Sequence, residues 1–396
     1  MTGAEPVLSG QARESFLRTL SAAVFLLFVQ IYMLAPLIPS LAESLGESRQ
    51  AVGILIPAFT LPYAVAGLIC GAFSDRLGRR GIFFAALLGF PVTSLLMAVT
   101  GSLASLTLSR AFSGIADVGI VVMGLTLVGD VFAPAERGRA LGWVFGAIAG
   151  GGALGSTGGA LLAPWIGWRG LFALTGLMGF VPLARALPLW RPLADSRPAR
   201  SPESFRLVLA GYARLLSTAR ARWTYLYITL NALFHGGVFT WLGAYFSDRY
   251  QLREAGIGLA LIGYGIPGLL LGPRIGAVVD RHGRRWLIPL GLAVAAASAA
   301  ILALRLPLLG AVLAVTLLSL SFDMTHPLLA GIATTLDVQR RGQAMGLNTF
   351  AIFLGFSLGS PLFGWLAAQD MGRALAFFAA GQFGLAVIAV GAFRSE

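Results

Sequence analysis

Long apolar stretches separated by short charged clusters dominate this sequence. Residues 19–42, 50–74, 140–168 and 223–247 contain no Arg, Lys, Asp or Glu. Each stretch is long enough to cross the hydrocarbon core of a bilayer as a helix, which takes about 20 residues. Positions 22–29 are apolar on every side of the chain rather than at alternate positions, so the pattern predicts helices and not the strands of a membrane barrel.

Twelve membrane spans follow from the spacing of these stretches. Their predicted bounds are 17–41, 50–73, 81–100, 103–131, 140–163, 169–190, 222–246, 255–279, 285–304, 307–332, 343–368 and 371–393. The fold class that we expect is therefore an all-α polytopic membrane protein. An even number of spans places both chain ends on the same side of the membrane.

The composition agrees with this prediction and excludes other classes. Hydrophobic residues make up 57% of the chain and charged residues 12%, with a mean hydropathy of +0.80, far from the composition of soluble proteins. A soluble enzyme and a secreted disulfide scaffold are excluded, the latter also because Cys70 is the single cysteine. No cleavable signal peptide is expected, because residues 1–18 carry acidic as well as basic side chains.

The net charge of +12 comes from Arg, whose placement predicts orientation rather than nucleic-acid binding. Positive residues are retained in cytoplasmic loops. With a cytoplasmic N-terminus, most of the 29 Arg fall in cytoplasmic loops or at the cytoplasmic ends of spans. The Arg predicted on the outer face of the membrane are Arg49, Arg169, Arg249, Arg253, Arg305 and Arg373. We expect a multi-pass protein of a bacterial-type inner membrane with both termini in the cytoplasm.

One long hydrophilic segment, 191–222, separates the sixth and seventh spans. Its first half is rich in Pro and Ser and is typical of a linker. From 204 to 219 apolar residues recur at helical spacing, which predicts an amphipathic helix at the inner membrane surface. The segment is either a tether or a regulatory arm, and the tether is the simpler interpretation, because basic amphipathic segments beside membrane spans are common.

An internal repeat relates the two parts of the chain. The sequence Gly71-Ala-Phe-Ser-Asp75-Arg76-Leu-Gly78-Arg79-Arg80 returns 205 residues later as Gly276-Ala-Val-Val-Asp280-Arg281-His-Gly283-Arg284-Arg285. A second pair of loops, 136–142 and 340–346, is offset by 204 residues. We therefore expect two parallel six-helix halves, 1–190 and 222–396, joined by a cytoplasmic linker at 191–221, with a transport site at their interface.

These motifs resemble those of the major facilitator superfamily of secondary transporters, over essentially the whole chain. The resemblance rests on the doubled loop motif, on Arg110-Ala-Phe-Ser-Gly114 at the start of the fourth span, and on Asp130-Val-Phe-Ala-Pro-Ala-Glu136-Arg137-Gly138-Arg139-Ala140 after it. In the fifth span, Gly151-x-x-x-Gly155-Ser156-Thr157-Gly158-Gly159 is similar to the signature of twelve-helix drug/proton antiporters, with Ser156 at the usual proline position.

The resemblance implies a conformational latch at the cytoplasmic face. Asp75 and its repeat would bind helix N-termini of the facing half, Asp75 in the outward-facing state, and neighbouring Arg would complete a charge network. The latch residues expected are Gly71, Asp75, Arg76, Gly78, Arg79, Arg80, Asp280, Arg281 and Arg284. A simpler interpretation, that these Arg only mark cytoplasmic loops, does not explain why Asp and Gly recur in both copies.

Few ionisable side chains fall inside the predicted spans, where they are costly unless they face a cavity or a partner. We expect Asp117, Asp323 and Arg110 to carry proton coupling. Because spans one, four, seven and ten line the central cavity in the resembled fold, Asp117 and Asp323 are expected to face each other from opposite halves. The cavity residues expected are Gln30, Tyr32, Tyr227, Asn231, His235, Trp241, Asp323 and His326.

Structural roles are the alternative for several of these residues. Asp117 could pair with Arg110 two turns away, and His326 could satisfy the backbone group that Pro327 frees. The glycines expected to allow close helix packing are Gly146, Gly150, Gly155 and Gly159. The pattern at 150–155 also matches a dinucleotide loop, but it lies in an apolar span with no preceding strand. The sequence contains no catalytic motif or metal-binding cluster, so we expect no enzyme activity, cofactor or metal.

The expected function is proton-coupled export of small amphipathic or apolar compounds by alternating access. Three alternatives stay open: symport or facilitated uptake of sugar-like or organic-acid solutes, transport of lipid-like substrates, and a membrane sensor that does not transport. Hydroxyl-rich substrates would predict more Asn and Gln in the cavity spans than Gln30 and Asn231 provide. The partners expected are a small-molecule substrate, protons and the lipid bilayer, with no nucleic acid, and we expect a monomer.

Overall fold

The computed structural model describes residues 8–394 apart from 9, 134–135, 196–204, 268–269, 272–274, 276–277, 279–282 and 338–339. Within these ranges it describes all side chains except those of 71–77, 194–195, 205 and 341. The described residues form helices, turns and loops, and no strand occurs among them. Eight of the described helical stretches are long and apolar enough to span a membrane. The predicted all-α membrane fold class is confirmed.

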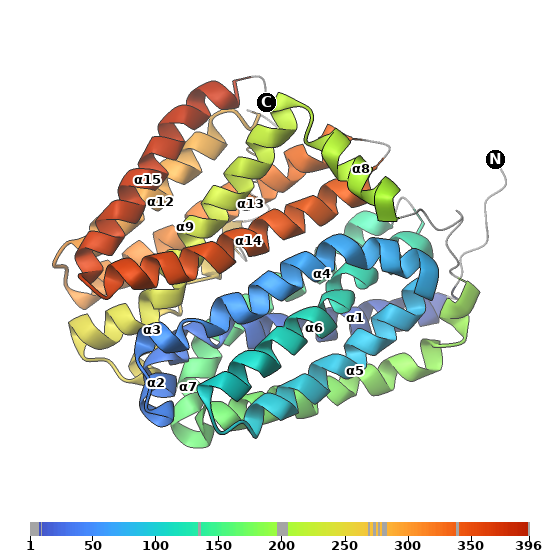
Figure 1. Ribbon diagram of the computed structural model, residues 1–396, viewed down its shortest axis with the longest axis horizontal. Helices are drawn as coiled ribbons and strands as arrows, with labels where there is room; N and C mark the ends of the chain where they lie inside the picture. Colours follow the sequence, from blue (N-terminus) through green and yellow to red (C-terminus); the bar gives the residue numbers. More distant parts are fainter. Residues whose placement is uncertain are drawn as a thin grey trace.

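The helices form two groups that lie side by side (Figure 1). The first group comprises α1 (Gly10–Tyr32), the 3-10 turn η1 (Ala35–Leu37), α2 (Ile38–Leu45), α3 (Arg49–Val52), α4 (Leu55–Leu77), α5 (Arg79–Ala98), α6 (Leu103–Val131) and α7 (Arg137–Ala186). The linker carries 3-10 turns at Leu187–Leu189 and Pro192–Asp195 and the helix α8 (Phe205–Leu215). The second group comprises α9 (Ala219–Tyr250), α10 (Glu254–Ala260), α12 (Leu287–Ala303), α13 (Leu308–Leu336), α14 (Arg341–Ala367) and α15 (Met371–Ala392). The domain bounds at 190 and 222 stay a prediction.

Two of the predicted span boundaries differ in the structure for local reasons. The first span was expected as one helix over 17–41, but α1 ends at Tyr32 and the chain passes through η1, which contains Pro36, before α2 begins. The fifth and sixth spans are joined in α7, which bends at Gly167 with φ 66° and ψ 171°. Only glycine adopts this conformation without strain, so a single residue replaces the expected loop at 164–168.

The eighth span is also interrupted. It was expected as one helix over 255–279, but α10 ends at Ala260, and Gly265 has φ 94°. The hydroxyl of Ser319 in α13 accepts a hydrogen bond of 2.9 Å from the Gly265 amide. This contact satisfies a backbone group that the broken helix leaves free, as an apolar environment requires.

Polar side chains fix the starts of several helices. Ser102 caps α6 and forms a reciprocal capping box with Ser105. The Asp370 carboxylate accepts a hydrogen bond of 2.6 Å from the Arg373 amide at the start of α15, and Thr218 caps α9. Such caps satisfy amides that have no partner within the helix, and they allow the short loops at these positions.

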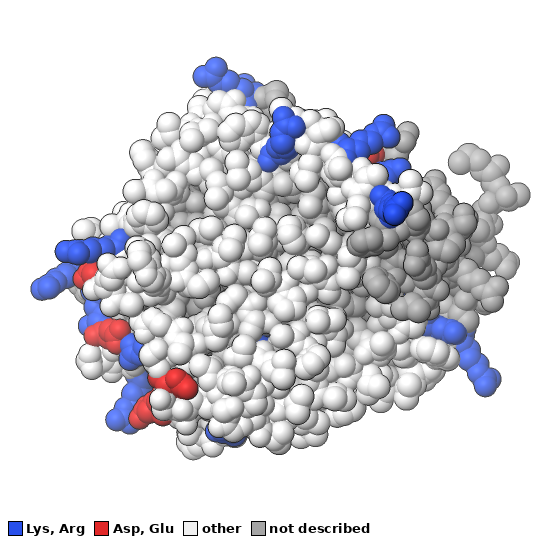
Figure 2. Space-filling model, in the orientation of Figure 1, with Lys and Arg blue, Asp and Glu red and all other residues white. Residues whose placement is uncertain are grey.

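Charged side chains gather at two opposite ends of the molecule and leave a wide uncharged band between them (Figure 2). Large apolar side chains such as Leu108, Phe112 and Ile115 are exposed, which suits contact with lipid rather than water. We call the end that carries Arg13, the start of α5 and α8 the basic end, and the end that carries α2 and α3 the opposite end. The placement of Arg in the sequence predicts that the basic end is the cytoplasmic one.

The helix α8 bridges the two helix groups at the basic end, beside α14 in Figure 1. The Tyr212 hydroxyl donates a hydrogen bond of 3.0 Å to the Leu68 carbonyl of α4. Burial raises the pKa of Tyr212 above its ordinary value, so the hydroxyl keeps the proton that it donates. Gly211 lies against Gln343 in α14. The predicted amphipathic segment is therefore a docked helix rather than a loose tether.

Close contact between α1 and α7 depends on glycine. A Cβ atom at Gly155 would lie 2.9 Å from the Cα atom of Val29, and one at Gly159 would lie 2.6 Å from the Cβ atom of Met33. Gly146 has nothing within 4 Å, and Gly150 has only ordinary contact with a neighbouring ring. The close packing expected at all four glycines is therefore found at two of them.

The second helix group repeats this arrangement. A Cβ atom at Gly355 of α14 would lie 2.8 Å from the Leu233 amide nitrogen of α9, and one at Gly359 would lie 2.9 Å from the Gly237 nitrogen. These two glycines follow Gly151 and Gly155 by 204 residues. The internal repeat thus extends to the contacts between helices.

Replacing Gly155 by Ala should destabilise the protein by about 1–3 kcal/mol, because the added methyl group collides with backbone atoms that cannot turn aside. Gly146→Ala is the matched control, since it lies on the same helix in open space and should leave the melting temperature in detergent unchanged or slightly raised. Equal melting temperatures for the two variants would contradict the packing described above.

The orientation predicts that a cysteine at Ala210 in α8 is shielded from outside the cell, whereas one at Glu47 is accessible. Both positions are exposed, and Cys70 would first be replaced by Ala. A membrane-impermeant maleimide should label Glu47→Cys in intact cells and Ala210→Cys only after the cells are opened. The reverse pattern would invert the topology.

Candidate functional site

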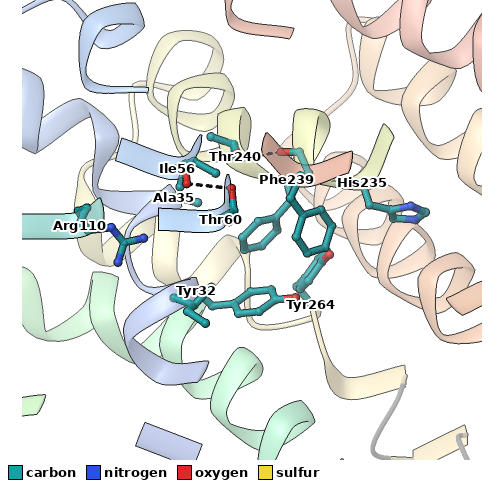
Figure 3. Close-up of a pocket in the computed structure, with 12 residues that line it drawn as sticks. Tyr32, Ala35, Ile56, Thr60, Arg110, His235, Phe239, Thr240 and Tyr264 are labelled. Atoms are coloured by element: carbon teal, nitrogen blue, oxygen red, sulfur yellow. Dashed lines mark hydrogen bonds between the residues drawn. The ribbon is translucent and has the colours of Figure 1, made fainter. Parts of the chain in front are cut away.

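A small internal cavity of about 40 Å³ lies between the two helix groups (Figure 3). A cavity of this volume has room for water, whereas pockets for drug-sized ligands measure about 300–1,000 Å³. The structure thus shows a contracted arrangement of a site that both groups share. The lining residues are Ile31, Tyr32, Ala35, Ile56, Thr60 and Arg110 from the first group, and His235, Gly236, Phe239, Thr240, Tyr264 and Phe356 from the second.

Aromatic rings form one wall of the cavity and cross from one helix group to the other (Figure 3). The ring centroids of Tyr32 and Phe239 are 5.3 Å apart, and those of Phe239 and Tyr264 are 4.5 Å apart. Of these three residues the sequence singled out only Tyr32. Nothing in the sequence distinguishes Phe239 and Tyr264 from the many other aromatic residues of the chain.

Arg110 reaches the cavity from α6 and is 1% exposed (Figure 3). Its Nε atom donates a hydrogen bond of 3.3 Å to the Leu55 carbonyl, and its Cζ atom lies 4.5 Å from the ring centre of Phe59. Its Nη1 atom is buried and has no hydrogen-bond partner in the described part of the chain. A cation in this setting is stabilised only in part, by one carbonyl and one aromatic face.

Asp117 lies two turns further along α6 and is fully buried. Its Oδ2 atom accepts a hydrogen bond of 2.5 Å from the Ser113 hydroxyl, and its Oδ1 atom has no partner among the described residues. The ion pairs found within the described ranges involve other side chains. Asp117 and Arg110 interact electrostatically along α6 but do not form the direct ion pair that a purely structural pairing would give.

Asp323 in α13 also has a buried oxygen, Oδ2, without a partner in the described residues. It interacts electrostatically with Tyr32 and Tyr264 of the cavity wall, whereas Asp117 lies beside Ser113. The two aspartates, expected to face each other, have separate surroundings. His326 stacks on Phe322 with ring centroids 5.0 Å apart, which is a packing contact rather than the backbone cap considered above.

A buried hydrogen-bond network joins α9, α13 and α15 behind the cavity. The His235 ring nitrogens lie 2.9 Å from the Asn231 carbonyl and 3.1 Å from the Ser321 hydroxyl. The Asn231 amide donates to Thr325 at 2.9 Å and accepts from Gln382 at 3.0 Å. His235 thus touches the cavity while its nitrogens are engaged, and Asn231 holds helices together.

Three further residues predicted for the cavity do not line it. The Gln30 side chain accepts a hydrogen bond of 3.2 Å from Ser94 in α5. The Tyr227 hydroxyl donates to a backbone carbonyl of α15 at 3.2 Å, and the Trp241 indole donates to a carbonyl of α14 at 2.9 Å. Each of these side chains joins two helices of the same group, which is a structural role. The spacing of residues in the sequence does not distinguish such a role from lining the cavity.

Arg79 and Arg80 of the predicted latch form contacts with α6 and with the chain that follows α7. Arg79 Nη1 lies 2.7 and 2.6 Å from the two carboxylate oxygens of Asp130. Arg80 donates to the Trp190 carbonyl at 2.8 Å and stacks over its ring at 4.2 Å. Gly78 begins α5 with φ 86°, as a tight turn requires.

The rest of the latch is only partly visible. Arg284 lies beside Gly331 of α13. Asp280 and Arg281 lie outside the described residues, as do the side chains at 71–77, which include Gly71, Asp75 and Arg76. The latch between the two halves therefore stays a prediction.

Contacts between the helix groups close the opposite end of the molecule. Arg49 of α3 forms an ion pair with Asp248 of α9 and a hydrogen bond of 3.5 Å with Ser247. A Cβ atom at Gly243 of α9 would lie 2.9 Å from the Cα atom of Pro36 in η1. The cavity is thus separated from the opposite end by packed backbone and an ion pair.

Comparison with known proteins finds similarity over the whole chain. The model of the Major Facilitator Superfamily matches residues 20–334 and 245–396. The uncharacterized MFS-type transporter YceJ of Bacillus subtilis is 25% identical over 367 residues, which cover 90% of this chain and 91% of that protein. The quinolone resistance protein NorA of Staphylococcus aureus is 24% identical over 355 residues, 87% of each chain. The crystal structure of a D-xylose-proton symporter superposes with a TM-score of 0.78 at 17% identity, covering 96% of this chain and 97% of that one.

Reversing the charge at Arg49 should loosen the opposite end. The two side chains are 33% and 56% exposed, so the pair contributes about 0.2–1 kcal/mol, and Arg49→Asp should raise access to the cavity by up to about fivefold. A cysteine at Thr240 in the cavity, treated with an impermeant maleimide from that side, reports this access. The double variant Arg49→Asp with Asp248→Arg should restore slow labelling, and failure to do so would remove the pair from the closure.

Proposed function

This chain belongs to the Major Facilitator Superfamily, a family of membrane transporters and not of enzymes, and on that premise we propose that it exports small amphipathic or apolar compounds in exchange for protons. The observation that carries the proposal is the cavity that both helix groups line. Parallel halves with a site at their interface can expose that site to either side of the membrane by rocking about it.

The contacts at the two ends support an alternating-access cycle. The opposite end is closed by the Arg49 ion pair and by η1 against α9. At mid-depth the Thr60 and Ser357 hydroxyls, from α4 and α14, are 2.7 Å apart. At the basic end, the ion pairs of Arg13 and Arg79 stay within the first helix group. Opening at the basic end therefore breaks fewer of the described ionic contacts than opening at the opposite end.

The buried carboxyl groups support proton coupling. A buried carboxylate without a directly paired cation is costly, and the hydrogen bond that Asp117 makes among the described residues is with the Ser113 hydroxyl, while Arg110 acts on it only at a distance. The neutral form suits this arrangement, whereas the charged form needs water or a nearer Arg110. When the conformational change brings water or Arg110 to the carboxyl group, Asp117 releases its proton. Asp117, with Asp323 as a second site, thereby couples the transport cycle to the proton gradient.

The lining of the cavity supports amphipathic or apolar substrates and an export role. Rings of Tyr32, Phe239, Tyr264 and Phe356 contribute most of the large side chains around it. Similarity to a quinolone resistance protein also favours export. In this proposal the protein is a monomer in a bacterial-type inner membrane with both termini in the cytoplasm, with six-helix halves at 1–190 and 222–396 and a cytoplasmic linker between them.

Asp117→Asn should abolish transport driven by a pH gradient while it spares downhill exchange of substrate, because a permanently neutral side chain cannot carry a proton across. Substrate flux in proteoliposomes, measured with and without an imposed gradient, checks this. Asp370→Asn is the matched control, because Asn can also cap α15. If Asp117→Asn and Asp323→Asn both kept full proton-driven flux, the coupling role given to these two aspartates would be wrong, and a wild-type flux that ignores the pH gradient would indicate a uniporter.

A further inference from the structure

We propose that the cavity selects aromatic compounds that carry a carboxylate or similar anionic group, and that Arg110 binds this anion. The inference rests on the transport function proposed above and names the class of substrate. It follows from two features of the cavity: a cation with a buried donor that has no partner in the described residues, and an aromatic wall.

The guanidinium of Arg110 has donors to spare. A guanidinium group carries five N–H donors in a planar fork. Nε is used by the Leu55 carbonyl, while Nη1 is buried without a partner among the described residues. A buried donor with no acceptor costs free energy until a ligand supplies one. Because Arg110 also lines the cavity, a ligand in the cavity can supply that acceptor.

The charge of Arg110 is offset only at a distance, because Asp117 interacts with it electrostatically while no acidic side chain of the described structure forms a direct ion pair with it. Asp117, on the same helix, is hydrogen-bonded to Ser113 and forms no ion pair with Arg110. A carboxylate that enters the cavity would form charge-assisted hydrogen bonds, which are about twice as strong as neutral ones. It would also compensate a buried charge, which a neutral ligand of the same shape cannot do.

Three neutral polar side chains around the cavity, Thr60, Thr240 and His235, already have hydrogen-bond partners. The Thr60 hydroxyl lies 3.0 Å from the Ile56 carbonyl, and the Thr240 hydroxyl lies 2.6 Å from the Gly236 carbonyl. Both ring nitrogens of His235 have partners. The buried donor without a partner at the cavity belongs to the Arg110 guanidinium, which favours a ligand with a charged acceptor.

The aromatic wall faces the remaining part of the ligand. Tyr32 from α1 and Phe239 from α9 contact each other, and Tyr264 extends the row (Figure 3). Offset or tilted ring contacts of this kind stabilise a bound ring beyond the effect of the area that they bury. Because the present cavity is only about 40 Å³, an aromatic ligand must separate Tyr32 from Phe239 and insert between the two helix groups.

The test compares 2-naphthoate, 2-naphthamide and decanoate as ligands of the purified protein in nanodiscs, with affinity measured by calorimetry. The wild type should bind naphthoate at least tenfold more tightly than naphthamide, which has the same rings without the charge, and more tightly than decanoate, which has the charge without the rings. Equal affinities for naphthoate and naphthamide would overturn the proposal.

Variants assign the discrimination to Arg110. Arg110→Gln should abolish the preference for naphthoate over naphthamide, and Arg110→Lys should retain part of it. Arg249→Gln is the matched control, since Arg249 also lies near an aromatic ring, Tyr245, but not in the cavity, and it should keep the full preference. A preference that survives in Arg110→Gln would overturn the assignment.

Two further measurements keep the proposal testable if Arg110→Gln fails to fold. Phe239→Leu should weaken binding of naphthoate and naphthamide by the same factor, so that the ratio of the two affinities stays unchanged. A changed ratio would contradict the separate roles of the cation and the aromatic wall.

Flux of both compounds in proteoliposomes distinguishes the proposed binding site from the proposed export function. Selective binding without flux would refute export and leave the binding site, whereas equal flux of acid and amide would refute the site and leave the transporter.

Discussion

Close backbone contact at glycine holds the central helices of this protein in place. In a bilayer, helices gain no hydrophobic free energy from association, because lipid is as apolar as their own side chains, so packing at small residues takes over that role. Gly155 and Gly159 bring α7 onto α1, and Gly355 and Gly359 bring α14 onto α9. The helices that present Tyr32 and Phe239 to the cavity are thereby fixed to rigid neighbours, and the free surface between the two pairs is where the site forms.

Polar groups inside the apolar band fall into two kinds. Many are satisfied by neighbours: Asn231 and Gln382 hold each other, and Ser319 holds the amide of Gly265. Such groups stabilise the fold in a medium that offers no water.

Arg110, Asp117 and Asp323 are different, because each is an ionisable side chain inside the apolar band with a buried atom that has no partner in the described residues. The first lines the cavity and the third interacts with residues of its wall. A buried polar atom without a partner raises the free energy of this conformation, and a ligand or another conformation that supplies a partner is favoured by the same amount. We therefore assign transport roles to these three residues and not to the satisfied ones.

The sequence by itself determined the membrane location, the all-α class and the family, because apolar run length, Arg placement and the doubled loop motif depend only on local order along the chain. It also predicted the linker helix, and it drew attention to Arg110, Asp117 and Asp323 through their cost in hydrocarbon. Only the tertiary structure decided which polar residues are satisfied by partners far away in sequence. It therefore moved Gln30, Tyr227, Asn231 and Trp241 out of the expected cavity, and it brought Phe239 and Tyr264 into its wall, because side-chain direction across packed helices is not encoded in spacing along one of them.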